Sequence, residues 1–189
     1  MAGLSHVTKL FSIVDCKLTV LTADPVGGTA TYAATSIDIP GIQELAISGS
    51  IQSKTLRGDN TLLDTSSYID GVTASAKHAL LSLDALAAML GGAVTDSGAT
   101  PAQKAVWELT GSSAPTYFKI EGVTPPGGSS LIGGDVHVTL SKCMLSKFPD
   151  LGFAQDDYRI PSFEVSAVPL ASTGKWLSIT LNETAVAIP

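Results

Sequence analysis

Apolar and polar residues alternate with a period of two along much of the chain, which predicts β-strands. Near the N-terminus, Cys16, Leu18 and Val20 alternate with polar residues, the pattern of a half-buried strand. A turn over residues 24–28 and a partner strand over residues 29–33 follow. Further strands are expected over residues 104–109, 116–121, 135–147, 159–168 and 175–181.

A longer alternation begins at Leu45 and continues to Leu56. The sequence Arg57-Gly-Asp-Asn60 then supplies turn residues, and residues 61–79 form a returning extended segment. Both segments exceed the usual strand length of about 5–6 residues. We therefore expect a long β-hairpin over about residues 45–80.

One helix is predicted over residues 82–91. Ser82 suits the N-cap, and Asp84 places a carboxylate in the first turn, where the helix dipole favours it. Gly91 suits the C-terminal end. A helix of about two turns depends on packing for its stability. The residues expected to pack it on the sheets recur at helical spacing and are Leu83, Leu86 and Leu90.

Glycine and proline mark two further segments as loops, residues 92–101 and residues 124–134. The chain has 189 residues, which fits a single domain over residues 1–189. Many strands with one helix indicate a mainly β fold, a sandwich or a barrel.

Composition adds two expectations about partners. Charged residues make up 15% of the chain, below the usual ~25%, so we expect other copies to cover part of the surface. The net charge is −6 and the basic residues are scattered, which argues against a protein that grips nucleic acid, although not against one that encloses it. Neither a membrane span nor a secretory signal is expected.

Catalytic and metal-binding patterns are not found in the sequence. His6, His78 and His137 stand apart from one another, and Cys16 and Cys143 are too far apart in sequence for a zinc motif, so they are expected to be buried thiols. The glycine-rich segment 128–133 lacks the lysine of a phosphate loop. No catalytic residue, cofactor or metal is assigned, and we expect the protein not to be an enzyme.

Three smaller features leave alternatives open. The acidic cluster could bind Ca²⁺, although a solvated turn is the favoured interpretation; it comprises Asp150, Asp156 and Asp157. The Arg-Gly-Asp sequence at residues 57–59 is interpreted as a turn rather than an adhesion motif. An unrelated sugar-binding β-sandwich is disfavoured because aromatic residues are few and are expected in the core; the relevant ones are Trp107, Tyr117, Phe118 and Trp176.

Several segments resemble the major tail tube proteins of long-tailed, non-contractile bacteriophages (siphophages). Residues 51–92 resemble the family's long hairpin and the helix that follows it. The C-terminal likeness is more specific and rests on the segments Asp135–Met144, Phe148–Phe153, Ile160–Phe163, Gly174–Trp176 and Asn182–Thr184. Together the likeness covers about residues 40–184, and none of its motifs is a catalytic signature.

The resemblance implies a two-sheet β-sandwich or barrel with one flanking helix. It also implies rings, usually sixfold, that stack into a hollow tube in the virion, assembled in the bacterial host cytoplasm. Strands of neighbouring subunits join around the lumen, while the hairpin and flexible arms, here residues 1–15, connect successive rings. DNA passes through the lumen on ejection. Implied partners are the tape measure, tail terminator and baseplate proteins.

Within this interpretation, the hairpin residues expected to carry assembly are Ile51, Lys54, Leu56, Arg57, Asp59, Leu62 and Asp64. Those expected to face the lumen are Asp59, Asp64 and Asp70. Six copies, each carrying −6, place about −36 in a ring, which would repel phosphates. The alternatives are a tail terminator, a baseplate hub component or a secretion-system tube of the same fold, or an unrelated β-sandwich binding module.

Overall fold

The computed structural model describes residues 4–126 and 132–188, and these residues form a mainly β protein with one short helix. The strands are β1 (Asp15–Ala23), β2 (Thr31–Tyr32), β3 (Ile37–Asp38), β4 (Ile42–Gly58), β5 (Thr61–His78), β6 (Ala93–Ser97), β7 (Lys104–Glu108), β8 (Phe118–Thr124), β9 (Val136–Leu145), β10 (Ser162–Ala167) and β11 (Leu177–Leu181), and the helix is α1 (Leu83–Leu90). The mainly β fold class is thus confirmed.

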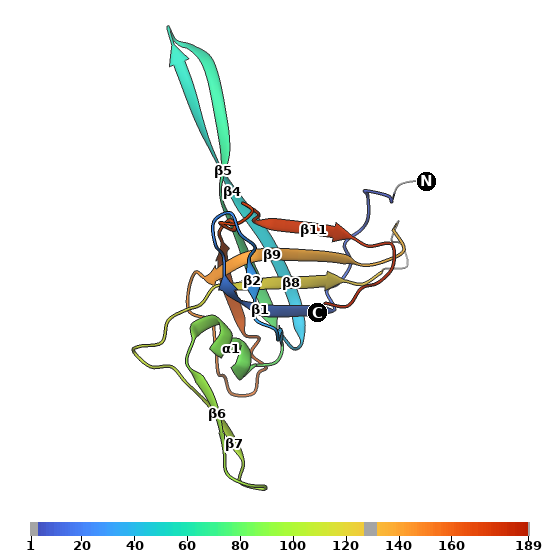
Figure 1. Cartoon of the computed structure of the whole chain (residues 1–189), viewed down its shortest axis with the longest axis vertical. Coiled ribbons are helices and arrows are strands. Elements are labelled where there is room, and N and C mark those ends of the chain that lie inside the picture. The colour runs from blue at the N-terminus through green and yellow to red at the C-terminus, as the bar shows by residue number, and fades with distance from the viewer. Residues whose placement is uncertain (1–3, 127–131, 189) are drawn as a thin grey trace.

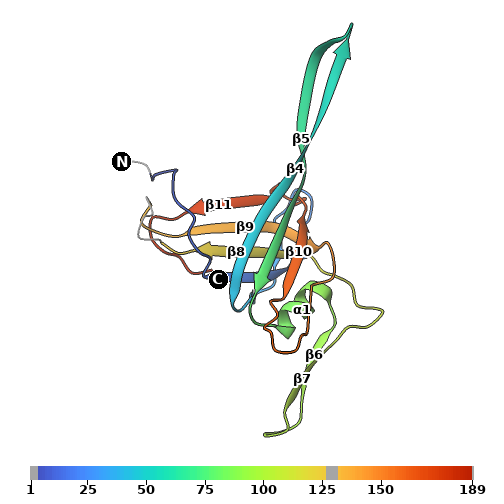
Figure 2. The same ribbon diagram turned by 180° about the vertical axis from the view of Figure 1, so that it is seen from behind.

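Nine of these strands form one antiparallel sheet. Its order is β2-β1-β8-β9-β10-β5-β4, with β3 paired to β1 and β11 paired to β9. Figures 1 and 2 show that β1, β8, β9 and β11 lie side by side along one axis, with chain direction alternating, and that β4, β5 and β10 cross them.

The expectation of two separate sheets is wrong in one respect, because the two sets of strands are joined by hydrogen bonds at β9. Residues 136–140 of β9 pair with β11, whereas residues 143–145 pair with β10. Strand β9 therefore belongs to both sets of strands. The sheet changes direction at the point along β9 where its pairing partner changes from β11 to β10.

The core lies between the crossing strands and is closed at one end by α1. Phe118, Ile120 and Leu140 come from β8 and β9, and Phe163 and Val165 come from β10; all five are buried. Helix α1 contacts β1, β3 and β9. Burying this apolar surface is the main favourable term in folding, so the crossing arrangement holds the molecule together.

Helix α1 has the expected caps. The side chain of Ser82 accepts a hydrogen bond from the N–H of Ala85 at 3.2 Å, and Asp84 lies in the first turn. Gly91 ends the helix with φ 76°. A Cβ atom at Gly91 would lie 2.7 Å from the carbonyl oxygen of Ala114, so both the backbone conformation and the close approach require glycine there.

The apolar stripe of α1 faces the core. Leu86 is 4% exposed and Leu90 is also buried, while Leu83 is partly buried and packs against the same cluster. Met89, which the stripe of leucines does not include, is buried as well. Ala85 and Ala88 are buried too, so five side chains of the helix are buried and Leu83 packs beside them.

Two sequence expectations are corrected by the structure. Residues 92–101 are not a loop throughout, because they contain β6, which pairs with β7 in a separate two-stranded hairpin. Tyr117 is not in the core but is 38% exposed, whereas Phe118 is buried, and Trp107 and Trp176 are partly buried against the core. Of the loop expected over residues 124–134, residues 127–131 lie outside the described residues.

Cys16 and Cys143 are free and buried. Burial raises the pKa of each thiol to about 12, with nearby Asp15 and Asp38 adding to the effect at Cys16. Both thiols are therefore neutral at physiological pH, and each serves as a small apolar side chain.

Candidate assembly surfaces

The outer part of the β4–β5 hairpin projects from the body as a two-stranded ribbon (Figure 1). We call residues 48–70 the distal ribbon. Strand β10 pairs with β5 only as far as Val72, so beyond that residue β4 and β5 pair with each other alone. Apart from Gly58, every residue of the distal ribbon is exposed. An isolated two-stranded hairpin is marginal in water, so this element is expected to gain stability from a partner.

The tip of the ribbon is a two-residue turn. Asp59 and Asn60 have φ of 48° and 60°, and Gly58 pairs with Thr61 on either side of them. Positive φ at both central residues is the signature of a type I′ turn, whose twist matches that of the strands. The turn expected over residues 57–60 is thus present, and it places Asp59 at the far end of the molecule.

Two register shifts alter the ribbon between its base and its tip. The first lies between Ser50 and Ile51 and leaves Asp70 without a direct partner on β4. The Asp70 carboxylate accepts a hydrogen bond from Gln52 Nε2 at 3.3 Å and from Ser50 Oγ at 3.5 Å. The second shift lies between Leu56 and Arg57 and leaves Leu63 of β5 without a direct partner on β4. Such irregularities increase local twist and re-aim side chains.

Paired residues share a face of the ribbon, and alternate residues along a strand do too. One face carries the pairs Ile51–Ile69, Ser53–Ser67 and Thr55–Thr65. The other carries Gln52–Tyr68, Lys54–Ser66 and Leu56–Asp64. Exposed large apolar side chains therefore occur on both faces, and neither face packs on the body of the molecule.

The two strands of the ribbon differ in charge. Strand β4 carries Lys54 and Arg57, whereas β5 carries Asp64 and Asp70. Within the residues that the structure describes, neither Lys54 nor Arg57 forms an ion pair. The Asp64 carboxylate accepts a hydrogen bond from the N–H of Thr65 at 2.7 Å.

The structure brings all the sequence-predicted hairpin residues onto this one element. Ile51 is 72% exposed, and the side chains of Leu56 and Leu62 are exposed to a similar degree. Asp59 is at the tip and Asp70 is near the base. The leucines of α1 belong to the core and are separate from the ribbon.

A second exposed apolar surface lies at the opposite end of β5, and sequence reasoning did not identify it. We call it the basal patch. Its largest members, Phe153 and Tyr158, are 90% and 97% exposed. Leu81 is exposed as well and lines the same hollow as these two side chains.

The basal patch contains a hollow of about 310 Å³, formed where the segment between β9 and β10 passes the end of β5. Asp157 and Arg159 line it together with apolar and aromatic side chains. The segment is tied to the sheet by the N–H of Asp150, which donates to Ser162 O at 2.8 Å, and by the N–H of His78, which donates to Pro161 O at 3.1 Å. These bonds hold the patch in place although its side chains are exposed.

The acidic residues considered for Ca²⁺ do not gather at one point. Asp150 forms a bridge to Ser162 through its backbone, Asp156 occupies a turn with φ 59°, and Asp157 lines the hollow of the basal patch. Across residues 4–126 and 132–188, the structure has no group of three or more His, Cys, Asp or Glu side chains that could hold a metal ion.

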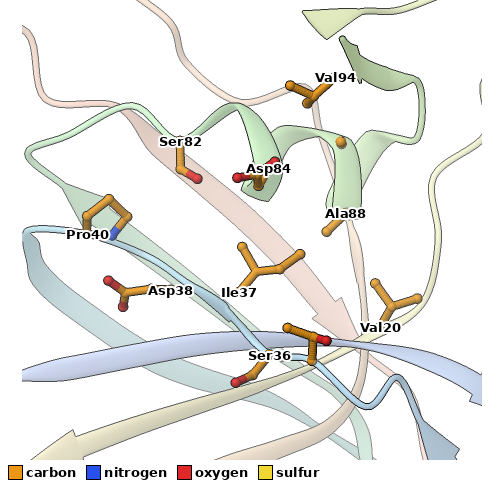
Figure 3. A pocket seen from close by; sticks show the side chains of 11 residues that line it. Val20, Ser36, Ile37, Asp38, Pro40, Ser82, Asp84, Ala88 and Val94 are labelled. Carbon is orange, nitrogen blue, oxygen red and sulfur yellow. The ribbon is translucent and has the colours of Figure 1, made fainter. Parts of the chain in front are cut away.

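A hollow of about 740 Å³ lies between α1, β3 and β6 (Figure 3). Ser82 and Asp84 lie on its helix side, and Ser36 and Asp38 lie on the side of β3. Its remaining lining is mostly apolar, and no histidine, cysteine, lysine or arginine lines it. Its charged groups are therefore carboxylates alone.

Two of the histidines have structural partners. His78 is buried, and its Nδ1 is 2.8 Å from Leu80 O. His137 Nε2 lies 2.9 Å from Val186 O and 3.2 Å from the carboxylate of Asp135. His6 lies exposed in the N-terminal segment, where the described residues 4–14 form no strand or helix.

Asp135 fastens the C-terminal segment to β9. Its carboxylate accepts hydrogen bonds from Asn182 Nδ2 at 2.8 Å and from the N–H of Val186 at 2.7 Å. Burial alone would raise the pKa of Asp135, but the bonds from Asn182, Val186 and His137 outweigh burial and lower it. Lys17 adds a further bond, to Ile188 O at 2.7 Å.

Comparison with known proteins does not identify a family for this chain. No family model matches the chain, and no curated protein matches its sequence. Within the part of the chain that the structure describes, no helix has the length and apolar character needed to cross a membrane.

Proposed function

We propose that this chain is a structural subunit that polymerises as stacked hexameric rings into the hollow tail tube of a long-tailed bacteriophage, through which genomic DNA is ejected. The observation that carries the proposal is the distal ribbon. It exposes Ile51, Leu56, Leu62, Tyr68 and Ile69 to solvent, and among the described residues its two strands pair only with each other. Monomeric soluble proteins rarely leave such surface uncovered, so contacts between copies account for it.

The edge of the sheet supports ring formation. Strand β4 is the last strand in the sheet order, so the N–H and C=O groups along its outer side are available for pairing. Exposed edges of this length are an aggregation hazard in a monomer. Joining strands from several copies into one closed barrel removes such edges. In the proposed tube, the β4 edge lies at the boundary between neighbours in a ring.

The negative charge of the chain supports a channel through which DNA passes without being bound. Each copy carries −6, and a lumen of the same sign as DNA repels phosphates and lets the duplex slide. In this proposal, Asp64 and Asp70 of β5 and Asp59 at the tip face the lumen. The protein then acts by assembly and not by catalysis, and its partners are its own copies and the tape measure, terminator and baseplate proteins.

Electron microscopy of the purified protein at increasing concentration tests the proposal. The full chain is expected to form hollow filaments of uniform width with a ring-like axial repeat. A shortened variant lacking residues 53–58 and 61–67 joins Gln52 to Asp59 and Asn60 to Tyr68, so it keeps the type I′ turn between two residues that already pair. That variant is expected to fold as a monomer and to form no filaments.

The matched control keeps the ribbon's length. Asn60→Gly alone retains a type I′ turn, because Asp-Gly suits its two central positions, so this variant, which leaves Asp59 unchanged, should still assemble. Dispersed monomers of the full chain at every concentration, or normal filaments of the shortened variant, would contradict the proposal. Closed rings that never stack would instead indicate a tail terminator or a hub component.

A further inference from the structure

The basal patch carries one acidic and one basic side chain at its hollow. Asp157 and Arg159 both line the hollow, and they flank Tyr158, which is 97% exposed. Neither charged side chain forms an ion pair among the described residues. The patch is therefore apolar and also complementary in charge to itself, as a contact between two identical surfaces requires.

The backbone around Tyr158 is exposed as well. Residues 157–159 belong to no strand and form no backbone hydrogen bond with the rest of the described chain. The same segment is anchored just beyond them, where Pro161 O accepts a hydrogen bond from the N–H of His78 at 3.1 Å. The sheet thus holds one end of the segment, while its centre presents unpaired N–H and C=O groups to solvent.

We infer that the basal patch is a self-association surface, on which two free subunits pair about a two-fold axis into a closed dimer. The axis passes beside Tyr158, and residues 157–159 of the two copies run antiparallel. Because residue 158 then faces its own copy, residue 157 faces residue 159. The Asp157 carboxylate of each copy meets the Arg159 guanidinium of the other, so the same ion pair forms twice.

The aromatic side chains of the patch set the strength of this contact. Phe153 is 90% exposed and lines the same hollow as Tyr158. Aromatic side chains bury about 150–250 Å² each, so these two can remove about 300–500 Å² per copy from water. A standard interface buries about 800 Å² per partner. We therefore expect a weak, reversible dimer with a dissociation constant on the order of 10–100 μM.

The dimer goes beyond the proposed function, because it is a state of the free subunit. A two-fold contact uses the same surface on both copies and leaves none for a third copy, so it closes and does not propagate. Rings that all stack in one direction have no such axis between neighbours. The dimer covers the exposed aromatic side chains of the patch before assembly, which limits non-specific association of the free subunits.

Sedimentation velocity of the full chain tests the inference, because monomers, dimers and filaments separate by size. We expect the share of dimer to rise with concentration. Asp157→Arg alone, or Arg159→Asp alone, places like charges opposite each other twice and should raise the dissociation constant at least about tenfold. The chain with both changes keeps the net charge of −6 and forms the same pairs with their signs exchanged, so it should dimerise like the original chain.

Matched controls change the net charge away from the patch. Glu183→Arg and Lys175→Asp alter exposed residues beyond the two ends of β11, and neither residue forms an ion pair among the described residues. They change the net charge by the same amounts as the two patch reversals. Both control variants should dimerise like the original chain.

Cross-linking locates the two-fold axis independently of charge. In the dimer, a thiol introduced by Tyr158→Cys faces its own copy, so oxidised glutathione should join two chains through a 158–158 disulfide. The native Cys16 and Cys143 are buried and do not compete. Lys175→Cys is the matched control and should give little covalent dimer under the same conditions.

The outcomes separate this inference from the proposed function. Free subunits that stay monomeric, a double reversal that dimerises no better than the single ones, or equal cross-linking at positions 158 and 175 would each overturn the dimer. Electron microscopy of filaments tests the tube separately. A chain that dimerises as described but never forms filaments would support the dimer and contradict the tube.

Discussion

Asp24, in the turn after β1, ties together three segments that are distant in sequence. Its carboxylate accepts hydrogen bonds from Lys142 Nζ at 2.8 Å and from the N–H groups of Ala171 at 2.8 Å and Ser172 at 3.0 Å. The bond from Lys142 is the main reason that the pKa of Asp24 lies well below its usual range. Lys142 Nζ also lies over the ring of Tyr117, at 4.8 Å from its centre.

This network predicts a pH dependence of stability. A carboxyl group whose pKa is lower in the folded chain than its unfolded value of about 3.9 stabilises the fold above that value, and the contribution is lost as the pH falls towards the folded pKa. Asp24→Asn should therefore lower the thermal midpoint at pH 7 and flatten its decline below about pH 4. Thermal unfolding followed by circular dichroism at several pH values between about 2.5 and 7 measures both effects, because this range includes the pH at which the contribution is lost.

Asp96→Asn on β6 is the matched control for Asp24→Asn. Asp96 is exposed, and its carboxylate makes no hydrogen bond or ion pair with the described part of the chain. Its substitution should leave the curve of midpoint against pH unchanged. If the curve of Asp24→Asn ran parallel to that of the original chain, the proposed role of the carboxylate would be wrong.

At the scale of single residues, local turns could be predicted from the sequence, but hydrogen bonds between distant segments could not. The turn over residues 24–28 could be predicted, because Asp, Pro and Gly have strong local preferences. The partners of Asp24 could not, because Lys142, Ala171 and Ser172 reach it only through tertiary structure. The same holds for Asp135, whose bonds to Asn182 and Val186 fix the C-terminal segment.

Among the elements, β5 combines a rigid half and an exposed half. Its inner residues, 72–77, pair with β4 on one side and β10 on the other. Its outer residues, 61–70, pair with β4 alone and are exposed. Local opening costs least where few buried contacts and many exposed hydrogen bonds occur, so the two halves should differ in dynamics.

Hydrogen exchange can measure this difference. In the monomer, amides of residues 72–77 should exchange slowly, and those of residues 61–70 should exchange much faster. In assembled filaments, the outer amides should slow by at least about tenfold, because docking buries them. Exchange followed by mass spectrometry on peptides from the two halves gives both rates. Equal protection of residues 61–70 in monomer and filament would show that the ribbon is not covered on assembly.

The sequence predicted the long hairpin because its residues alternate over many positions and meet at a clear turn. Strand β6 was missed because its five residues, including Thr95 and Asp96, are mostly polar and follow two glycines. The basal patch was missed because Phe153 and Tyr158 follow no period and lie among turn-forming residues. Periodicity identifies elements that pack on their own chain, and these exposed side chains do not.

At the scale of the whole molecule, four of the eleven basic side chains are already paired with carboxylates. These are Lys77, Lys119, Lys142 and Lys147. With a net charge of −6, the chain should show no measurable retention of duplex DNA in a gel-shift assay at physiological salt. The variant with Asp59, Asp64 and Asp70 all changed to Lys should bind DNA measurably. A shift produced by the original chain would contradict a repulsive conduit.

At the scale of the whole sheet, sequence could indicate the class of fold but not its continuity. Many short strands with one helix favour two layers of β structure, and crossing sets of strands are observed. That β9 bonds to both β10 and β11 depends on which edges meet in space. No local pattern in residues 136–145 distinguishes one partner from two.

The long ladder between β4 and β5 also decides how the molecule bears mechanical load. The ladder runs from the tip at Gly58 and Thr61 to Ile42 and His78 at the base, where β5 joins β10. Hydrogen bonds in an antiparallel pair lie perpendicular to the strands. A pull along the ribbon therefore loads many bonds together in shear, whereas a sideways pull peels them apart one after another. A filament joined by such ribbons is strong in tension along its axis and yields first when it is bent.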